Sequence, residues 1–411
     1  MISPSFPRVR LAAVVRQISP VNLSSNFSIA LDSIEPWSGR LLSDPPEELE
    51  TAGAAFEPGD ILFGKLRPYL AKVWVADRPG IYIGDFIRLC SLPNFEPQFL
   101  GYALRTREFI AAASAESTGT KMPRTEWDRL RQLCIPAPPL HVQQLIVDYL
   151  DRETAEIDAL RLETESLIHL AQERGNALSE RLVWGCDAPM MRLKFIADIL
   201  SGYPFKSEDF LDLSEDTIPL LRGINVSPQG VIWDSVVSLP SSQSRQFADY
   251  ILKSGDLVLG LDRPLISSGL RLAEVEAPDA GSLLVQRVAR IRSKDPSTSN
   301  KWLKVALRSS RFKAHLEPDF TGVSVPHMSP SQLSEFAIPI PPLEVQSEIL
   351  AEVNAENDAV SDSVIDLQLL LGRLEERRSA LISAAVTGQI DVTAQAVPAA
   401  EQLRDELEVH A

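Results

Sequence analysis

Two short basic turns contain the residues of this chain that are best suited to contact phosphates and base edges. Residues 65–69 carry two cations and an aromatic ring directly after an apolar run that is typical of a strand. Residues 118–124 combine hydroxyl groups, a glycine amide and two further cations. Arginine and lysine match guanine and phosphate, whereas hydroxyls and backbone amides bind phosphate oxygens. Both turns therefore indicate contacts with nucleic acid.

A purely structural role is the alternative for each turn. Arg67 would then pair with a local carboxylate, Tyr69 would pack in the core, and residues 118–124 would only shape the turn before the next strand. Three arginines between residues 287 and 292 alternate along a predicted strand. Their spacing favours a solvated or ion-paired face over DNA contact.

The motifs of common nucleic-acid enzymes are missing from the sequence. The chain has no P-loop, no glycine-rich dinucleotide fingerprint and no Asn-Pro-Pro-aromatic signature of an adenine methylase. Its five histidines and three cysteines lack the spacing of a zinc site or a catalytic triad. The cysteines are typical of small buried side chains in a reducing compartment. We therefore expect no catalytic residue, metal or cofactor on this chain.

An internal repeat organises the chain. The segment Ile-Pro-Ala-Pro-Pro-Leu-His-Val-Gln at 135–143 recurs as Ile-Pro-Ile-Pro-Pro-Leu-Glu-Val-Gln at 338–346, a shift of 203 positions. The same shift superposes the turn at 118–123 on its counterpart in the second copy. A shift of 196 superposes Gly-Asp-Ile-Leu-Phe-Gly at 59–64 on Gly-Asp-Leu-Val-Leu-Gly at 255–260. Ordered blocks at nearly constant offset indicate a duplicated unit with a small loop insertion in the second copy.

Each copy combines a globular part with a long helix. In the globular part, short apolar runs alternate with Gly, Pro, Asp and Asn, which is typical of strands and turns. Helical stretches are predicted near residues 97–113 and 300–316. The predicted fold class is α+β, with two mixed α/β domains separated by two long antiparallel coiled-coil helices in a pseudo-twofold internal repeat.

The long helices are predicted in proline-free stretches that follow the Pro-Pro pair of each copy. Apolar side chains recur there every three to four residues for about five heptads, as in a coiled coil. Glu153 and Arg174 interrupt this seam in the first helix, and Glu356 and Arg377 interrupt it at the same places in the second. Antiparallel pairing would bring Glu153 toward Arg377 and Arg174 toward Glu356. The alternative is that each helix packs only on its own domain.

The net charge of −16 argues against DNA as a ligand until its distribution is considered. Residues 139–185 have four basic and nine acidic side chains, and residues 342–411 have four and fourteen. The two globular parts are thus nearly neutral, and the acidic helices suit a protein partner better than DNA. The apolar runs are too short for a membrane span, and the N-terminus lacks a secretion signal. We therefore expect a cytoplasmic protein without membrane contact.

Over nearly its whole length the chain resembles the specificity subunits of type I restriction–modification systems. The resemblance rests on Phe-Gly-Lys-Leu-Arg-Pro-Tyr-Leu-Ala-Lys at 63–72, Ser-Thr-Gly-Thr-Lys-Met-Pro-Arg at 117–124, Ser-Gly-Tyr-Pro-Phe-Lys at 201–206, and the Pro-Pro-Leu-x-x-Gln opening of both helices. It implies that each globular part is a target recognition domain that reads one half of a split double-stranded DNA sequence. The paired helices would fix the gap between the halves, and the chain itself would not be an enzyme.

The resemblance also implies partners. The chain would bind two modification subunits, which methylate adenine, and two restriction subunits, which translocate and cut DNA. S-adenosylmethionine, ATP and Mg²⁺ are expected on those partners. The first copy departs from the family pattern, because Arg-Gln-Ile-Ser-Pro at 16–20 stands where the second copy has Gly-Tyr-Pro-Phe-Lys.

The predicted recognition domains are residues 1–138 and 186–341, the spacer helices are 139–185 and 342–390, and the tail is 391–411. In the first domain we predict DNA contacts by Lys65, Arg67, Tyr69, Lys72, Thr118, Gly119, Thr120, Lys121 and Arg124. In the second domain we predict contacts by Lys206, Arg263, Ser267, Arg271, Thr321, Gly322, Ser324 and His327. The alternative function is a structural coiled-coil scaffold whose two domains bind protein or glycan.

Overall fold

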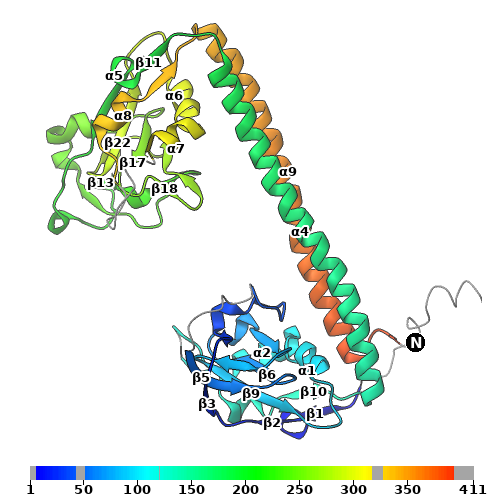
Figure 1. Cartoon of the computed structure of the whole chain (residues 1–411). Helices are drawn as coiled ribbons and strands as arrows, with labels where there is room; N and C mark the ends of the chain where they lie inside the picture. The colour runs from blue at the N-terminus through cyan, green and yellow to red at the C-terminus, as the bar shows by residue number, and fades with distance from the viewer. Residues whose placement is uncertain (1–5, 43–50, 120, 317–326, 393–411) are drawn as a thin grey trace, which may run out of the picture. The chain divides into compact units, whose positions relative to one another are not determined.

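The computed structural model describes residues 6–42, 51–119, 121–316 and 327–392. The chain divides into two compact units, of which unit 1 comprises residues 1–165 and 367–411 and unit 2 comprises residues 166–366. Each unit contains one globular domain and a stretch of both long helices, α4 (Leu140–Gly185) and α9 (Leu343–Thr387) (Figure 1). The long helices are continuous because their sequences lack proline.

Unit 1 is built on two four-stranded sheets and one strand pair. The first sheet has the order β2-β9-β6-β7 and is antiparallel, whereas the second has the order β3-β5-β8-β4 and contains the parallel pair β4–β8. The pair β1–β10 closes the domain next to α4. The strands are β1 (Arg8–Arg10), β2 (Val15–Gln17), β3 (Asn22–Ser25), β4 (Ser28–Ile29), β5 (Thr51–Phe56), β6 (Ile61–Gly64), β7 (Val73–Val75), β8 (Gly80–Tyr82), β9 (Phe86–Ser91) and β10 (Cys134–Pro136).

Unit 2 repeats the main sheet and the closing strand pair of unit 1, but its remaining described strands form shorter sheets. Its main sheet, β12-β22-β17-β20, has the strand order of the β2-β9-β6-β7 sheet, and the pair β11–β23 corresponds to β1–β10. Shorter sheets are β16-β13-β21, β14-β15 and β18-β19. The strands are β11 (Met190–Arg192), β12 (Ala197–Ser201), β13 (Thr217–Leu221), β14 (Val226–Ser227), β15 (Gly230–Val231), β16 (Ser238–Pro240), β17 (Leu257–Gly260), β18 (Leu265–Ile266), β19 (Gly269–Leu270), β20 (Leu272–Glu274), β21 (Leu283–Leu284), β22 (Val288–Ser293) and β23 (Ala337–Pro339).

Each predicted helical stretch is a pair of short helices. In unit 1 these are α1 (Pro97–Leu104) and α2 (Arg107–Ala115), and in unit 2 they are α6 (Asn300–Leu307) and α7 (Ser310–Leu316). The break occurs where a hydroxyl starts a new helix: Thr106 accepts from the Phe109 N–H, and Ser309 accepts from the Phe312 N–H. The remaining helices are α3 (Trp127–Leu130), α5 (Leu193–Ile196) and α8 (Pro330–Glu335).

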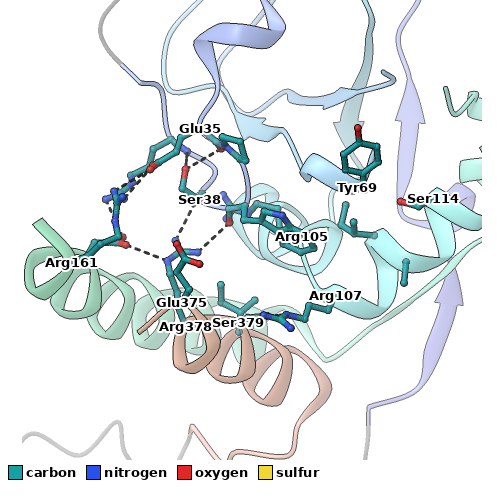
Figure 2. Close-up of a pocket in the computed structure, with 17 residues that line it drawn as sticks. Glu35, Ser38, Tyr69, Arg105, Arg107, Ser114, Arg161, Glu375, Arg378 and Ser379 are labelled. Atoms are coloured by element: carbon teal, nitrogen blue, oxygen red, sulfur yellow. Dashed lines mark hydrogen bonds and ion pairs between the residues drawn. The ribbon is translucent and has the colours of Figure 1, made fainter. Parts of the chain in front are cut away.

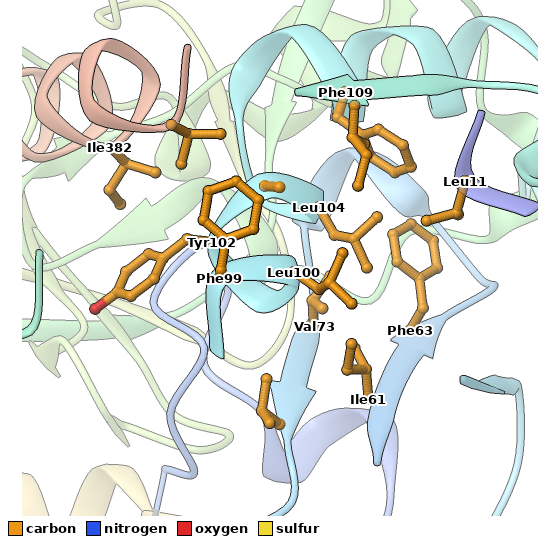
Figure 3. Close-up of a cluster of buried hydrophobic side chains, with 14 of the residues drawn as sticks. Leu11, Ile61, Phe63, Val73, Phe99, Leu100, Tyr102, Leu104, Phe109 and Ile382 are labelled. Carbon is orange, nitrogen blue, oxygen red and sulfur yellow. The ribbon is translucent and has the colours of Figure 1, made fainter. Parts of the chain in front are cut away.

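The main core of each unit includes side chains from both long helices. In unit 1, Ile146 and Leu150 of α4 and Ile382 of α9 belong to the cluster formed by the main sheet, α1 and α2 (Figure 3). In unit 2, Val183 of α4 and Leu350 of α9 belong to the corresponding cluster. Burying such side chains stabilises each by roughly 1.5–3 kcal/mol, so the helices are part of each domain rather than appendages.

Within each unit the two helix stretches are antiparallel, because the start of one helix lies with the end of the other. In unit 2, Arg174 pairs with Glu356 at 3.2 Å, which confirms the predicted cross-seam contact. In unit 1, the charges of Glu153 and Arg377 both act on the Tyr149 phenol, so each lies near that side chain; the approach of Glu153 to Arg377 stays a prediction. The helices therefore pack on each other as well as on their domains.

The central part of the predicted seam is only partly buried, which corrects the expectation of a continuous coiled-coil stripe: Thr164 is 4% exposed, but several leucines around it are open. Leu160, Leu167 and Leu370 are 51%, 47% and 43% exposed. Two paired helices bury only a narrow strip of each other, so apolar side chains outside that strip stay exposed. These leucines are available to a partner.

An identical glutamine fixes the start of both long helices. Gln143 donates to the Pro138 carbonyl at 2.8 Å and accepts from the Glu96 N–H at 2.9 Å. Gln346 donates to the Pro341 carbonyl at 2.9 Å. Both side chains are only 1% exposed, so the glutamine of the Pro-Pro-Leu-x-x-Gln motif joins each helix to its domain.

None of the helices described is long and apolar enough to cross a membrane.

Candidate nucleic-acid interface

The two basic turns of the first copy are far apart in sequence but adjacent in unit 1. The Arg67 N–H donates to the Pro123 carbonyl at 2.8 Å, and Leu66 forms a β-bridge with Arg124. We call residues 65–72 and 118–124 together the loop pair of unit 1. The sequence predicted two separate turns, whereas the end of strand β6 brings them into one surface.

Arg67 and Tyr69 both face solvent. Arg67 is exposed and has a φ of +51°, in the left-handed region that non-glycine residues rarely occupy. Its side chain has no hydrogen bond or ion pair with any residue that the structure describes. Tyr69 is 46% exposed. Among the residues that the structure describes, Arg67 therefore does not pair with a local carboxylate, and Tyr69 does not pack in the core. A strained backbone such as that of Arg67 is concentrated at functional sites.

Two lysines of this loop pair have partners within the fold. Lys72 Nζ donates to the Leu31 carbonyl at 2.6 Å, and Lys65 Nζ lies 3.5 Å from Glu126 Oε2. The first interaction holds the chain just after β4 (Ser28–Ile29), and the second is a weak ion pair at the surface. Lys65 keeps two of its three N–H donors for another ligand, whereas Lys72 is directed inward.

The turn at 118–124 is a tight loop with exposed side chains. Thr118 and Arg124 exchange two backbone hydrogen bonds of 2.9 Å each. Gly119 has a φ of +97°, and a Cβ there would lie 3.1 Å from the Met122 carbonyl oxygen. Lys121 is exposed and has no partner among the described residues, while Thr120 lies outside them.

Unit 2 repeats the arrangement with different side chains. Asp262 forms a β-bridge with His327, at the positions of Leu66 and Arg124. Arg263, the counterpart of Arg67, is exposed and has a φ of +45°. We call residues 261–271 and 327–328 the loop pair of unit 2; it includes Ser267, which is exposed between β18 and β19.

The other predicted residues of the second copy differ in their surroundings. Arg271 donates to the Val226 carbonyl at 3.1 Å and to the Asp262 carbonyl at 3.0 Å, and burial lowers the pKa of its guanidinium. Lys206 is exposed, 3.5 Å from Glu208, and belongs to neither loop of this pair. Thr321, Gly322 and Ser324 lie outside the described residues.

Charged partners hold the predicted residues in place, among them Arg287, one of the three arginines for which an ion-paired face was expected. In unit 1, Arg124 Nη2 donates to Asp85 Oδ2 at 2.6 Å. In unit 2, Asp262 Oδ2 accepts from Arg287 at 2.6 Å and Oδ1 lies 2.6 Å from His327 Nδ1. Burial raises the pKa of Asp262, but the hydrogen bonds from His327 and Arg287 outweigh it and lower the pKa below its usual value. The offsets of the repeat, 196 and 203, align Leu66 with Asp262 and Arg124 with His327, but they do not align Asp85 with Arg287.

A cavity of about 660 Å³ lies between the globular domain and the helix stretches of unit 1 (Figure 2). Asp158 of α4 accepts from Arg40 at 3.0 Å and lies 3.4 Å from Arg378 of α9. Arg105 donates to the Ser38 carbonyl at 2.8 Å, and burial lowers its pKa to about 10. These contacts clamp the loop around Ser38 onto the helices of unit 1.

Unit 2 has a cavity of about 990 Å³ at the equivalent place. Arg308, the counterpart of Arg105, donates to the Pro228 carbonyl at 2.9 Å, and burial lowers its pKa. Glu180 of α4 accepts from the N–H and hydroxyl of Ser310 at 2.9 and 2.8 Å. The described residues contain no group of histidine, cysteine and carboxylate side chains that could hold a metal ion.

Several known proteins that are similar to this chain are named as specificity subunits of type I restriction enzymes. No protein-family model matches it. The specificity subunit of the type I restriction enzyme EcoAI of Escherichia coli is 36% identical over 160 residues, which are 39% of this chain and 26% of that protein. The MjaVIII specificity subunit of Methanocaldococcus jannaschii is 27% identical over 261 residues, 60% of each protein. The matches thus span less than two thirds of either relative.

The fold is also that of a solved structure, described as "Structural basis underlying complex assembly and conformational transition of the type I R-M system". The TM-score is 0.71 over 95% of this chain and 100% of that chain, and at 18% identity the likeness concerns the fold alone. Sequence relatives and fold agree with the duplicated domains and paired helices described above. The chain is thus similar in sequence to the specificity subunits of type I restriction enzymes, and in fold to a chain of a type I R-M system.

Proposed function

We propose that this chain is the DNA-recognition subunit of a type I restriction–modification complex and has no catalytic site of its own. The observation that carries the proposal is the repeated loop pair. Both units present an exposed arginine, Arg67 or Arg263, in a left-handed conformation at the same place in the same sheet. Cations on rigidly held loops are suited to the DNA backbone and to base edges.

Each globular domain binds one half of a bipartite target. The recognition domains are residues 1–138 and 186–341, and the spacers are residues 139–185 and 342–390 with the tail 391–411 beyond them. Because the two loop pairs share a backbone but differ in side chains, the two half-sites differ in sequence. The helix pair sets the gap between them.

The DNA contacts divide by the freedom of each side chain. Arg67, Tyr69, Lys121, Arg263 and Ser267 are exposed, which supports direct contact. We also propose DNA contacts by the other predicted residues, which are Lys65, Thr118, Gly119, Thr120, Arg124, Lys206, Thr321, Gly322, Ser324 and His327. The internal hydrogen bonds of Lys72 and Arg271 support a role in shaping the loops instead.

The partners are two modification subunits and two restriction subunits, which carry S-adenosylmethionine, ATP and Mg²⁺. The exposed leucines of the long helices support a protein-binding role. Leu162, Leu170 and Leu369 are 58%, 55% and 59% exposed, in addition to the seam leucines described above. Aligned apolar side chains left open on a helix are typical of an interaction surface. Because the proposed ligand is DNA, the proposed location of the protein is the cytoplasm.

Methylation-sensitive sequencing of DNA from cells that express the three subunits tests this function. We expect a split, asymmetric motif with methylated adenine, which disappears when the gene for this chain is deleted. The matched control is the same strain without the modification subunit. Absence of a split motif, with active partners, would refute the proposal and favour the scaffold alternative.

A further inference from the structure

We infer that Arg124 in unit 1 and Arg287 in unit 2 read guanine, each held in its reading geometry by a neighbouring aspartate. The inference rests on the proposed function and adds which side chains determine specificity. Three structurally equivalent positions carry it, here called the junction triad. The triad is Leu66, Asp85 and Arg124 in unit 1, and Asp262, Arg287 and His327 in unit 2.

The backbone shows that the positions are equivalent. The Lys65 N–H donates to the Asp85 carbonyl at 2.7 Å, and the Leu261 N–H donates to the Arg287 carbonyl at 2.8 Å. Asp85 and Arg287 each come directly before the central strand of their main sheet, β9 or β22. The other two positions are joined by a β-bridge in each unit.

Each triad holds one exposed arginine on one carboxylate, but the roles change position. In unit 1 the arginine is the third member and the aspartate the second. In unit 2 the arginine is the second member and the aspartate the first, which also holds His327. The exposed fractions are 48% for Arg124 and 69% for Arg287. The pair of one arginine and one carboxylate is thus kept, while both members change position in the triad.

This geometry fits base reading better than phosphate binding. Arg124 uses Nη2 and Arg287 uses Nη1 for the aspartate, and their remaining N–H groups have no partner among the described residues. A guanidinium fixed at one nitrogen can present a planar pair of donors to guanine O6 and N7. The cations shared by both units, Arg67 and Arg263, contact phosphate instead, since a residue common to both copies cannot distinguish different half-sites.

The test compares Arg124→Gln and Arg287→Gln in the complete complex. Glutamine prefers adenine, so each variant should lose methylation at targets with guanine at one position of one half-site. Each should bind an oligonucleotide with the original target roughly 10- to 100-fold more weakly, with a smaller loss when that guanine is replaced. Arg124→Gln should affect only one half-site, and Arg287→Gln only the other.

Arg131→Gln and Arg192→Gln are the matched controls, because both arginines are exposed and pair with surface carboxylates away from the junctions. A thermal unfolding curve for each variant separates misfolding from altered base recognition. Asp85→Asn and Asp262→Asn should weaken recognition of the same base as the arginine that each aspartate holds. An unchanged motif with equally weaker binding to all DNA would overturn the inference while the proposed function stands. A wild-type complex that yields no split motif would instead reject the proposed function.

Discussion

At the scale of single residues, the repeat acts as an internal comparison. Arg67 and Arg263 occupy equivalent positions, share an uncommon backbone conformation and are both exposed. The neighbouring triad positions carry different charges in the two units. The two shared arginines therefore contact the part of DNA that both half-sites have in common, which is the sugar–phosphate backbone.

Arg67→Ala and Arg263→Ala should weaken binding to all DNA sequences without changing the methylated motif. Loss of one phosphate contact should reduce the slope of log K against log salt by about 1. Fluorescence anisotropy over a salt series measures this, with Arg131→Ala as the control. A changed motif in either variant would contradict the phosphate role.

A buried tyrosine gives unit 1 a dependence on alkaline pH. Burial, with the hydrogen bond of 2.6 Å to Asp151, raises the pKa of Tyr102 from 10.0 to about 12. The neutral phenol is therefore favoured in the folded state. Its contribution, on the order of 2–3 kcal/mol, is complete below pH 10 and is lost as the pH rises through about 12.

The tyrosinate absorbance of the intact protein should accordingly include a transition near pH 12 from Tyr102, beside those of Tyr82 and Tyr149, whose pKa values burial also raises. Tyr102→Phe should abolish it and flatten the loss of stability between pH 10 and 12. Tyr69→Phe is the matched control, because that phenol is on the surface and its removal should leave the late transition in place. A late transition that persists in Tyr102→Phe would assign it to another residue.

At the scale of elements, each long helix is attached to its domain by the motif that begins it. Gln143 and Gln346 bridge the Pro-Pro turn and the loop before α1 or α6 with buried hydrogen bonds. The clamp of Asp158 and Arg378 adds a second attachment in unit 1. Helix and domain thus form one folding unit. This explains why the boundary between the two compact units cuts through the long helices and does not separate the helices from the domains.

Gln143→Leu should destabilise the protein by about 1–3 kcal/mol, because it leaves the Glu96 N–H and the Pro138 carbonyl without their partner. Gln144→Leu makes the same chemical change at the adjacent exposed position and should have little effect. Chemical denaturation of both variants measures the difference. Equal stabilities of the two variants would show that the buried glutamine is dispensable.

At the scale of the whole molecule, charge and apolar surface are distributed by role. The globular parts are nearly neutral, and the helical segments hold most of the excess negative charge and the exposed leucines. A helix surface that repels DNA and offers apolar side chains suits protein subunits. DNA contacts and subunit contacts thereby occupy different parts of the chain.

Removing one heptad from each helix, residues 161–167 and 363–369, should shorten the gap in the target and keep both half-sequences. Seven residues correspond to about 10 Å of helix, or roughly three base pairs. Sequencing of methylated DNA measures the gap, and exchange of residues 1–138 for another recognition domain is the control that should change one half alone. Two altered halves after the heptad deletion would contradict the role of the helices as spacers.

Periodicity and ordered repeats were enough to predict the duplication, the mixed domains, the long helices and the cross-seam pairing of Arg174 with Glu356. Residue types also pointed to both basic turns of the first copy. That these turns form one surface, that Lys72 is directed inward and that Leu160 and Leu167 remain exposed depends on contacts between distant segments, which the folded chain alone reveals. The pairing of Asp85 with Arg124 across 39 residues has no local signal, because it depends on which strand ends meet at the edge of the sheet.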